Sequence, residues 1–458
     1  MKDKKLDVKD KKVLVMGLGL HGGGAGTVEF LARRGAAITV TDLRTRRQLA
    51  PTIRALKHLK GIRYVLGEHR MEDFLAADLI IKNPGVRRDS PYLKAADARG
   101  IPITSDMDIF FAACPARMIG ITGTRGKSTT TYLIWLFLKT KFGSRVHYAG
   151  NIRRSVLTIL PRIKKDDVVV LELSSFQLQD LGHEKKSPAI AVITNLLRDH
   201  LNWHRDVREY YDAKSVIFRF QKSGDRLFYN GDDAAVRRLV SAASRHVGTR
   251  AASPLATALQ AVVDRNLGAH YRSSVALAIA VARHFGISDT AITKTLRNYK
   301  GLPARQEFIA IVRGVRFIND TTATIPDAAI AAIRRFRPLA GPDHKLILLA
   351  GGQDKKLDFR AMIKEIKKQV DRIVFLPGSA TERIKNKVAS IQMLEAKSMA
   401  EAVDAAYGMA EKGDYIVLSP GATSFGLFLN EFDRGDRFVH AVKELAHKNL
   451  FNISRYPA

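Results

Sequence analysis

A glycine-rich segment between a strand pattern and a helix pattern constrains this chain more than any other feature. The segment runs from Gly120 to Thr129 and reads GITGTRGKST, after an apolar strand predicted over 118–122 and before a helix predicted over 128–141. Glycines let backbone N–H groups turn toward an anion, and the new helix presents its positive end. The segment therefore predicts a phosphate-binding loop within a parallel α/β sheet.

We expect this loop to bind ATP. Lys127 would reach the β- and γ-phosphates, and the Ser128 hydroxyl would bind Mg²⁺. The strict phosphate-loop pattern has glycine where Ile121 stands, so a chance glycine-rich turn is the alternative. The other residues expected to contact the nucleotide are Gly123, Thr124, Gly126 and Thr129.

A second glycine-rich turn follows the first predicted strand. Gly17, Gly19 and Gly22 have the spacing of a dinucleotide-binding turn, and Asp42 lies 20 residues after Gly22, where an acid can bind a ribose hydroxyl. A phosphate loop elsewhere in the chain argues against a dehydrogenase, because hydride transfer needs no ATP. We expect this turn to bind another phosphorylated nucleotide, with a purely structural tight turn as the alternative.

Two polar side chains follow apolar strands, where ligands of open α/β sheets bind. Glu172 ends a strand predicted over 168–173 and could hold a phosphate-bridging cation, or it could pair with one of the many bases. His200 comes after a strand predicted over 189–194 and could bind a metal or a phosphate oxygen, although a lone histidine is more often structural. Lys214 lies on a predicted helix, and composition does not distinguish it from a solvated lysine.

The alternation of strand and helix patterns predicts an α/β chain of three domains. We expect a Rossmann-like domain over 1–113, a central phosphate-loop ATPase domain over 114–303 and a second Rossmann-like domain over 304–458. In the last domain, strands are predicted over 315–318, 345–350, 372–376 and 415–418, and an amphipathic helix over 398–412. The stretch 225–266 gives no clear pattern.

Composition excludes several classes of protein. The 458 residues include one cysteine, so an intrachain disulfide and a cysteine-ligated zinc site are impossible, which fits the reducing cytoplasm. No apolar run approaches the ~18 residues of a membrane span. The 75 lysines and arginines exceed the 45 acids by 30, which favours polyanionic partners, but the basic residues are scattered. We therefore expect no nucleic-acid partner.

The ordered set of motifs resembles the Mur ligases over essentially the whole chain. It comprises residues 17–22, 83–85, 120–130, 150–152, 171–177, 199–200, 213–214, 301–305, 319–324, 351–359 and 418–435. Within that family the resemblance is greatest to the members that add D-glutamate to UDP-N-acetylmuramoyl-L-alanine. It implies those two substrates, ATP, two Mg²⁺ ions and a protein that we expect to be a monomer.

The resemblance also implies roles for individual residues. Lys127, Glu172, His200 and Lys214 would be catalytic; the last three with Ser128 would bind metal, Lys214 as a carbamate. Arg305 and Asp320 would contact ATP, and Asn151 would lie near the muramoyl-alanine. The UDP part would contact Leu20, His21, Asp42, Arg44, Asn83 and Gly85, and the incoming glutamate Thr324, Lys355 and Ser424.

Two other functions stay open from the sequence. One is a different ATP-dependent amide ligase of the same superfamily. The other is a nucleic-acid-dependent NTPase, suggested by net charge and phosphate loop, although no aromatic-studded basic strand is present to stack bases. This chain also departs from the usual pattern of the family at Arg125, Thr322 and Tyr271.

Overall fold

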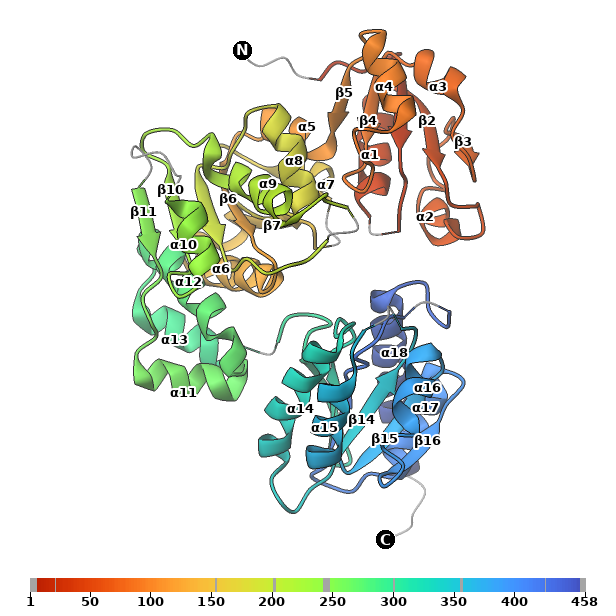
Figure 1. Cartoon of the computed structure of the whole chain (residues 1–458), viewed down its shortest axis with the longest axis vertical. Helices are drawn as coiled ribbons and strands as arrows, with labels where there is room; N and C mark the ends of the chain where they lie inside the picture. Colours follow the sequence, from red (N-terminus) through yellow and green to blue (C-terminus); the bar gives the residue numbers. More distant parts are fainter. Residues whose placement is uncertain are drawn as a thin grey trace. The chain divides into compact units, whose positions relative to one another are not determined.

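The computed structural model describes residues 6–20, 22–152, 155–200, 203–241, 248–299, 301–354, 357–424 and 426–453. They form three α/β sheets, coloured from red to blue in Figure 1. The chain divides into two compact units. One consists of residues 1–263 and 271–297 and contains the first two sheets, and the other consists of residues 264–270 and 298–458.

The first sheet has five parallel strands in the order β3-β2-β1-β4-β5. The strands are β1 (Lys12–Met16), β2 (Ala37–Asp42), β3 (Arg63–Leu66), β4 (Leu79–Lys82) and β5 (Ile103–Ser105). The helices are α1 (Gly23–Ala32), α2 (Ala50–Ala55), α3 (Met71–Leu75), α4 (Pro91–Ala98) and α5 (Asp106–Ala113). Apolar residues of α1 and α5 pack on one face of this sheet, and those of α3 and α4 on the other.

The second sheet has six parallel strands in the order β11-β10-β9-β6-β8-β7. The strands are β6 (Arg117–Thr122), β7 (Val146–Gly150), β8 (Val168–Glu172), β9 (Ile190–Ile193), β10 (Arg226–Tyr229) and β11 (Gly248–Ala251). The helices are α6 (Lys127–Phe142), α7 (Val156–Ile159), α8 (Ser175–His183), α9 (Val207–Arg219), α10 (Ala234–Val240), α11 (Thr257–Asn266), α12 (Arg272–His284) and α13 (Asp289–Arg297). Stretch 225–266, unassigned from sequence, thus contains two strands and two helices.

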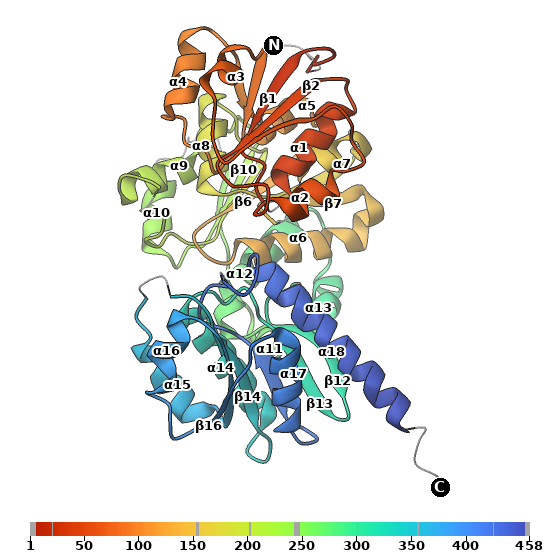
Figure 2. The ribbon, with the colours of Figure 1, turned by 90° about the vertical axis from the view of Figure 1, so that its right-hand side faces the viewer.

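The third sheet has the order β12-β13-β17-β14-β15-β16, and only the β12–β13 pair is antiparallel. The strands are β12 (Glu307–Val312), β13 (Val315–Asn319), β14 (Leu346–Gly351), β15 (Arg372–Leu376), β16 (Gln392–Glu395) and β17 (Tyr415–Leu418). The helices are α14 (Pro326–Ala340), α15 (Arg360–Gln369), α16 (Ser379–Lys385), α17 (Met399–Gly408) and α18 (Glu431–Ile453). Figure 2 shows the long helix α18 beside β12 and β13.

The inner strands β14, β15 and β17 of the third sheet are apolar on both faces because helices cover both faces. In β14, Leu346 and Leu348 point to the core under α14, α15 and α16, whereas Ile347 and Leu349 point to the core under α17 and α18. The predicted helix over 398–412 is shorter in the structure, where α17 ends at Gly408. Three sheets of mostly parallel strands confirm the predicted α/β fold.

One hydrophobic core joins the first two sheets. It includes Val28 of α1, Phe110 of α5, Val156 of α7 and Leu178 of α8, all fully buried. Helices α1 and α7 approach so closely that a Cβ atom on Gly26 would lie 2.4 Å from Ser155 Oγ. The two sheets therefore form one packed unit rather than two domains on a linker. Among the described residues no helix is long and apolar enough to cross a membrane.

Candidate active site

The candidate site lies at the carboxyl ends of four adjacent strands of the second sheet. In the order β9-β6-β8-β7, these strands end at Ile193, Thr122, Glu172 and Gly150. Because the strands are parallel, their loops meet at one edge of the sheet. The phosphate loop follows β6, and α6 begins at Lys127 directly after it.

Two glycines give the phosphate loop its backbone path. Gly123 has φ +147° and Gly126 has φ +76°, a region that side chains with a Cβ disfavour. A Cβ atom on Gly123 would lie 1.9 Å from Thr194 Oγ1, and one on Gly126 would lie 2.6 Å from Ser274 Oγ. Larger residues at these positions would displace the loop from the strand ends.

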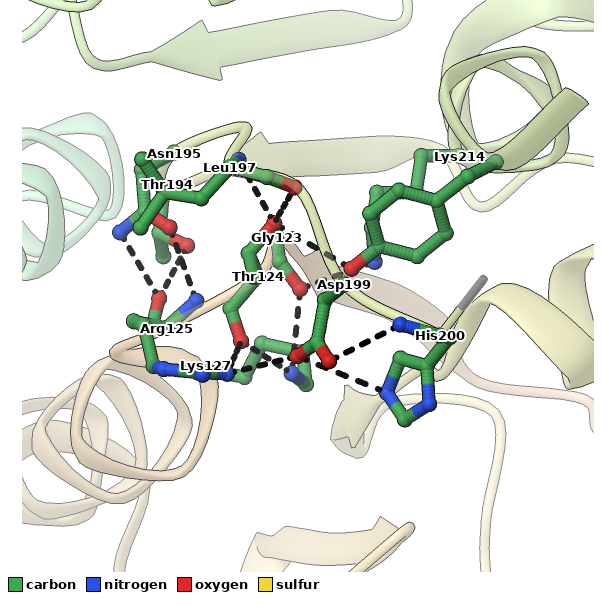
Figure 3. A network of polar contacts seen from close by, with 11 residues as sticks. Gly123, Thr124, Arg125, Lys127, Thr194, Asn195, Leu197, Asp199, His200 and Lys214 are labelled. Carbon is green, nitrogen blue, oxygen red and sulfur yellow. Dashed lines mark hydrogen bonds and ion pairs between the residues drawn. The ribbon is translucent and has the colours of Figure 1, made fainter. Parts of the chain in front are cut away.

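The segment after β9 holds the phosphate loop in place (Figure 3). Asn195 accepts a hydrogen bond from Arg125 N at Oδ1 (2.8 Å) and donates from Nδ2 to Arg125 O (3.0 Å). Thr194 Oγ1 also donates to Arg125 O at 2.6 Å. Thr124 Oγ1 accepts from Leu197 N at 2.9 Å. Residues 194–197 thus hold the loop at Thr124 and Arg125 through both backbone and side-chain hydrogen bonds.

Lys127 and Lys214 both reach the loop from helices. Lys127 Nζ donates to Gly123 O at 3.0 Å and to Thr124 O at 3.1 Å, and Lys214 Nζ donates to Gly123 O at 2.9 Å. Lys214 is 1% exposed, and burial, reinforced by the charge of Lys127, lowers its pKa well below the usual value. Lys214 is therefore a buried amine, not the solvated lysine that was the alternative from sequence.

Tyr210 is a residue of this site to which the sequence assigned no role. Its ring lies 4.6 Å from Lys214 Nζ, and its hydroxyl donates to Thr124 Oγ1 at 3.2 Å. Burial raises the pKa of Tyr210 to about 12, so its hydroxyl stays protonated and remains a donor. Tyr210 lies four residues before Lys214 on the same helix, a spacing that places both side chains on one face, and this is the sequence signal that could have indicated its role.

Glu172 has a carboxylate suited to a cation. Its Oε1 accepts from Asn151 Nδ2 at 3.2 Å, whereas Oε2 is buried without a hydrogen-bond partner among the described residues. A buried carboxylate oxygen is costly to leave unpaired, and Mg²⁺ prefers such oxygen ligands. No group of three or more His, Cys, Asp and Glu side chains close enough to hold a metal occurs in the described part of the chain. A complete metal site would therefore need further oxygens from Ser128, a modified Lys214 and the nucleotide.

His200 lies on the same edge, in an unusual backbone conformation. Its φ is +54°, and its backbone N donates to Asp199 Oδ1 at 2.9 Å. Burial lowers the pKa of His200, although the Asp199 charge opposes this shift. The imidazole is thus biased toward the neutral form that binds metals, and it packs edge-on against Phe176 with ring centroids 5.2 Å apart.

The glycine turn of the first sheet is shaped by Asp42. Its Oδ2 accepts from Leu18 N (2.9 Å) and Gly19 N (3.1 Å), and its Oδ1 accepts from Arg44 N (2.9 Å). The carboxylate therefore orders the turn directly. Of the other predicted nucleotide contacts, Leu20 is half-buried beside this turn and Asn83 packs against Gly17, while His21 lies outside the described residues.

Of the residues predicted in the third sheet, Asp320 and Thr324 follow β13, Ser424 follows β17, and Arg305 precedes β12, which pairs with β13. Asp320 is fully enclosed, accepting from Gln306 N at 3.1 Å and Ser419 Oγ at 2.7 Å, and burial raises its pKa to about 7. Ser424 is 3% exposed, and Arg305 and Thr324 are half-buried. Lys355 lies outside the described residues.

A buried arginine, not predicted from the sequence, ties two of these loops together. The Arg434 guanidinium donates to Thr321 O at 2.7 Å, to Thr321 Oγ1 at 3.1 Å and to Ala422 O at 3.1 Å. Burial lowers its pKa to about 10, so it remains charged. Arg434 thus fixes the loops that contain Thr324 and Ser424.

A glycine-rich loop between β6 and α6, a buried carboxylate at the end of β8 and a buried lysine of α9 together form a site suited to a phosphorylated nucleotide. Three sequence families match this chain in order: the Mur ligase MurD-like N-terminal domain at residues 11–105, the Mur ligase middle domain at 121–276 and the Mur ligase glutamate ligase domain at 304–421. The chain belongs to the Mur ligase family.

Curated relatives match the chain over its full length. A UDP-N-acetylmuramoylalanine–D-glutamate ligase of Roseiflexus is 39% identical, over 96% of this chain and 99% of the relative. A ligase of the same name from Borreliella afzelii is 35% identical over the same shares.

Solved structures support the fold. A UDP-N-acetylmuramate-alanine ligase from Thermotoga maritima superimposes with a TM-score of 0.62 at 17% identity, covering 95% of this chain and 99% of that one. A MurF ligase from the same organism, solved with ADP, gives a TM-score of 0.54 at 16% identity over 97% of each chain.

Proposed function

We propose that this chain joins D-glutamate to UDP-N-acetylmuramoyl-L-alanine at the expense of ATP, in cytoplasmic synthesis of peptidoglycan precursors. Two facts support this activity: the relatives of that name, which match 96% of this chain, and the match of residues 11–105 to the MurD-like N-terminal domain. The observation that carries the chemistry is the meeting of Lys127, Glu172 and Lys214 at one sheet edge.

The reaction needs two steps because a carboxylate is a poor acyl donor. The alanine carboxylate attacks the γ-phosphorus of ATP, the bond to the β-phosphate oxygen breaks, and an acyl phosphate and ADP form. The glutamate amine then attacks the acyl carbon, gives up a proton and displaces inorganic phosphate, leaving an amide. Lys127 and the backbone N–H groups of the loop would offset the negative charge gathered in the first step.

The cation-binding residues fit Mg²⁺. Glu172, with its unpartnered Oε2, would hold it together with Ser128, His200 and a carbamate on Lys214. When bound, Mg²⁺ neutralises phosphate oxygens and so favours attack by an anion. The carbamate would form when the unprotonated Lys214 amine adds to CO₂ and loses one proton, which changes a buried neutral amine into an anionic oxygen ligand.

The two other sheets would supply the substrate sites. The turn ordered by Asp42, with Leu20, Arg44, Asn83 and Gly85, would bind the UDP part, and Asn151 would lie near the alanine. The other sites would lie at the strand ends of the third sheet: Arg305 and Asp320 would contact ATP, and Thr324, Ser424 and Lys355 the incoming glutamate. We expect the enzyme to act as a monomer.

One incubation tests this function. Purified protein, ATP, Mg²⁺ and UDP-N-acetylmuramoyl-L-alanine are mixed with D- or L-glutamate, and product mass and phosphate release are measured. We expect one amide and one phosphate per turnover with D-glutamate only. Amide with another amino acid would assign a different Mur-type ligase, and ATP hydrolysis that responds to RNA or DNA without amide formation would favour the NTPase.

A further inference from the structure

A buried ion pair links the first two sheets beside the proposed UDP site. Lys82, the last residue of β4, donates from Nζ to Asp180 Oδ2 of α8 at 2.7 Å, and their side chains are 2% and 3% exposed. The other carboxylate oxygen, Oδ1, accepts from Arg88 Nε at 3.2 Å. Both carboxylate oxygens of Asp180, on a helix of the second sheet, thus accept hydrogen bonds from cationic side chains that follow or end a strand of the first sheet.

The same lysine closes the turn that contains Asn83 and Gly85. Lys82 Nζ also donates to Val86 O at 3.1 Å, across the three residues in between. Inside the turn, Gly85 N donates to Asn83 Oδ1 at 3.1 Å, and Asn83 N donates to Met16 O at 2.9 Å. One ammonium group therefore sets both the shape of this turn and its attachment to α8.

Helix α8 connects this attachment with the phosphoryl-transfer edge. It begins at Ser175, just after Glu172, and its start is fixed by a capping box between Ser174 and Gln177. Asp180 therefore lies on a rigid helix anchored beside Glu172.

A second attachment runs to the segment of His200. Arg87 Nη1 donates to Trp203 O at 2.7 Å, and Trp203 N donates to His200 O at 3.0 Å. The segment 82–88 is thus hydrogen-bonded both to α8, which begins just after Glu172, and to the segment that contains His200.

We propose that Lys82 and Asp180 form a positioning pair that sets the distance and angle between the UDP-binding turn and the phosphoryl-transfer site. This inference rests on the proposed function. The substrate must extend from one site to the other, and a small displacement of its carboxylate from the γ-phosphate slows the reaction strongly. In this chain the buried pair would favour one orientation of the first two sheets over others that their apolar contacts also allow.

The test replaces both members of the fully buried pair, so that only Arg88, whose side chain is 30% exposed, loses its partner carboxylate. The double variant Lys82→Met/Asp180→Leu replaces both charged side chains with apolar ones; methionine is close to lysine in size, whereas leucine is larger than aspartate. The matched control is Arg283→Met/Asp289→Leu, which removes an exposed ion pair of the middle sheet, at 2.8 Å and 52% and 69% exposure. The charge-preserving variant Asp180→Glu lengthens the pair by one methylene and serves if the double variant does not fold.

We expect the double variant to melt near the wild-type temperature, with kcat/KM for the UDP substrate at least tenfold lower and KM for ATP within twofold of wild type. Asp180→Glu should show a smaller loss in the same parameter. Unchanged kinetics in a folded variant would overturn the proposal, and so would equal losses toward both substrates that follow a fall in melting temperature, since they would indicate a purely structural pair.

A distance measurement separates this inference from the proposed function. Spin labels on Lys57→Cys and Arg237→Cys, in a Cys114→Ser background, report the separation of the first two sheets without any turnover. We expect a narrow distance distribution that broadens in the double variant but not in the control. If the distribution broadens in the double variant but the wild-type chain forms no amide, the positioning role is supported and the ligase activity is refuted. If the distribution does not change, the positioning role is refuted.

Discussion

The guanidinium of Arg125 donates to Asp199 Oδ2 at 2.8 Å and so joins the phosphate loop to the turn that contains His200. Arg125 is one of the positions at which this chain departs from the usual pattern of its family. Its partner Asp199 also accepts from the His200 backbone, and His200 Nε2 lies 3.8 Å from Asp199 Oδ2. The departure therefore has a structural role: it orients the carboxylate that holds His200.

Replacing Arg125 with Gln should reduce kcat by about 3- to 30-fold, equivalent to roughly 0.7–2 kcal/mol in activation free energy. Stability should change little, because the pair is partly exposed and such pairs contribute about 0.2–1 kcal/mol. Steady-state kinetics and thermal melts measure the two effects. A variant with normal kcat would show that Asp199 keeps its orientation without Arg125.

Replacing Lys127 with Ala should lower ADP formation by on the order of 10²-fold or more, because the charge that faces the phosphates is lost. Lys139→Ala, at an exposed position of the same helix α6, is the control and should retain activity. A coupled assay for ADP measures both. Turnover retained in Lys127→Ala would place the nucleotide elsewhere.

Replacing Lys214 with Ala should reduce activity by on the order of 10²–10³-fold, and short carboxylates such as acetate should restore part of it by supplying the missing anionic oxygen. Exposed Lys222→Ala is the matched control. Carbon-13 NMR of wild-type protein in labelled bicarbonate should show one carbamate signal that Lys214→Ala lacks. Normal activity without carboxylate would remove Lys214 from the mechanism.

Replacing Gly123 with Ala should abolish ATP binding, because the new Cβ would overlap Thr194 Oγ1, 1.9 Å away, and displace the loop. The control is Gly143→Ala, which also has positive φ (+58°) but no atom within 4 Å of the added Cβ. It should cost about 1–2 kcal/mol in stability and leave ATP binding intact. Calorimetric titration with ATP distinguishes them, and equal affinities would contradict the assigned role of the loop.

Replacing Asp320 with Asn should flatten the pH dependence of stability. Burial raises the pKa of Asp320 from 3.8 to about 7, so the folded state binds a proton that the unfolded state releases. Wild-type stability should therefore be fully present below pH 4 and fall as pH rises to about 7, by at most about 4 kcal/mol. Thermal melts from pH 4 to 8 test this, with exposed Asp343→Asn as control. An unchanged slope in Asp320→Asn would contradict the raised pKa.

Much of the fold follows from local sequence. Strands β15 and β17 occupy the ranges predicted for them, because unbroken apolar runs are typical of strands covered on both faces. Strand β12 was not predicted, since it lies at the sheet edge and Phe308 and Ile311 remain exposed. Its mixture of apolar and polar residues is also typical of a loop. Only the antiparallel pairing with β13 identifies it as a strand.

The site was predictable where a residue's chemistry depends on its neighbours in sequence. The phosphate loop with Lys127 is of this kind. Lys82 and Asp180 are 98 residues apart, and each sits in a segment that gives no sign of the other. Their pairing arises only when the first two sheets and their helices pack together. The same holds for the burial of Lys214, which the sequence alone does not distinguish from a lysine on the surface.

The common core beneath α1, α5, α7 and α8 has a consequence for how this protein can be divided. A fragment cut after residue 113 would expose to water the surfaces of α1 and α5 that pack against α7 and α8, and its remainder would expose the matching surfaces of α7 and α8. Each half would be prone to aggregate when expressed alone. The first two sheets would therefore have to be kept together in any truncated, swapped or redesigned form of this protein.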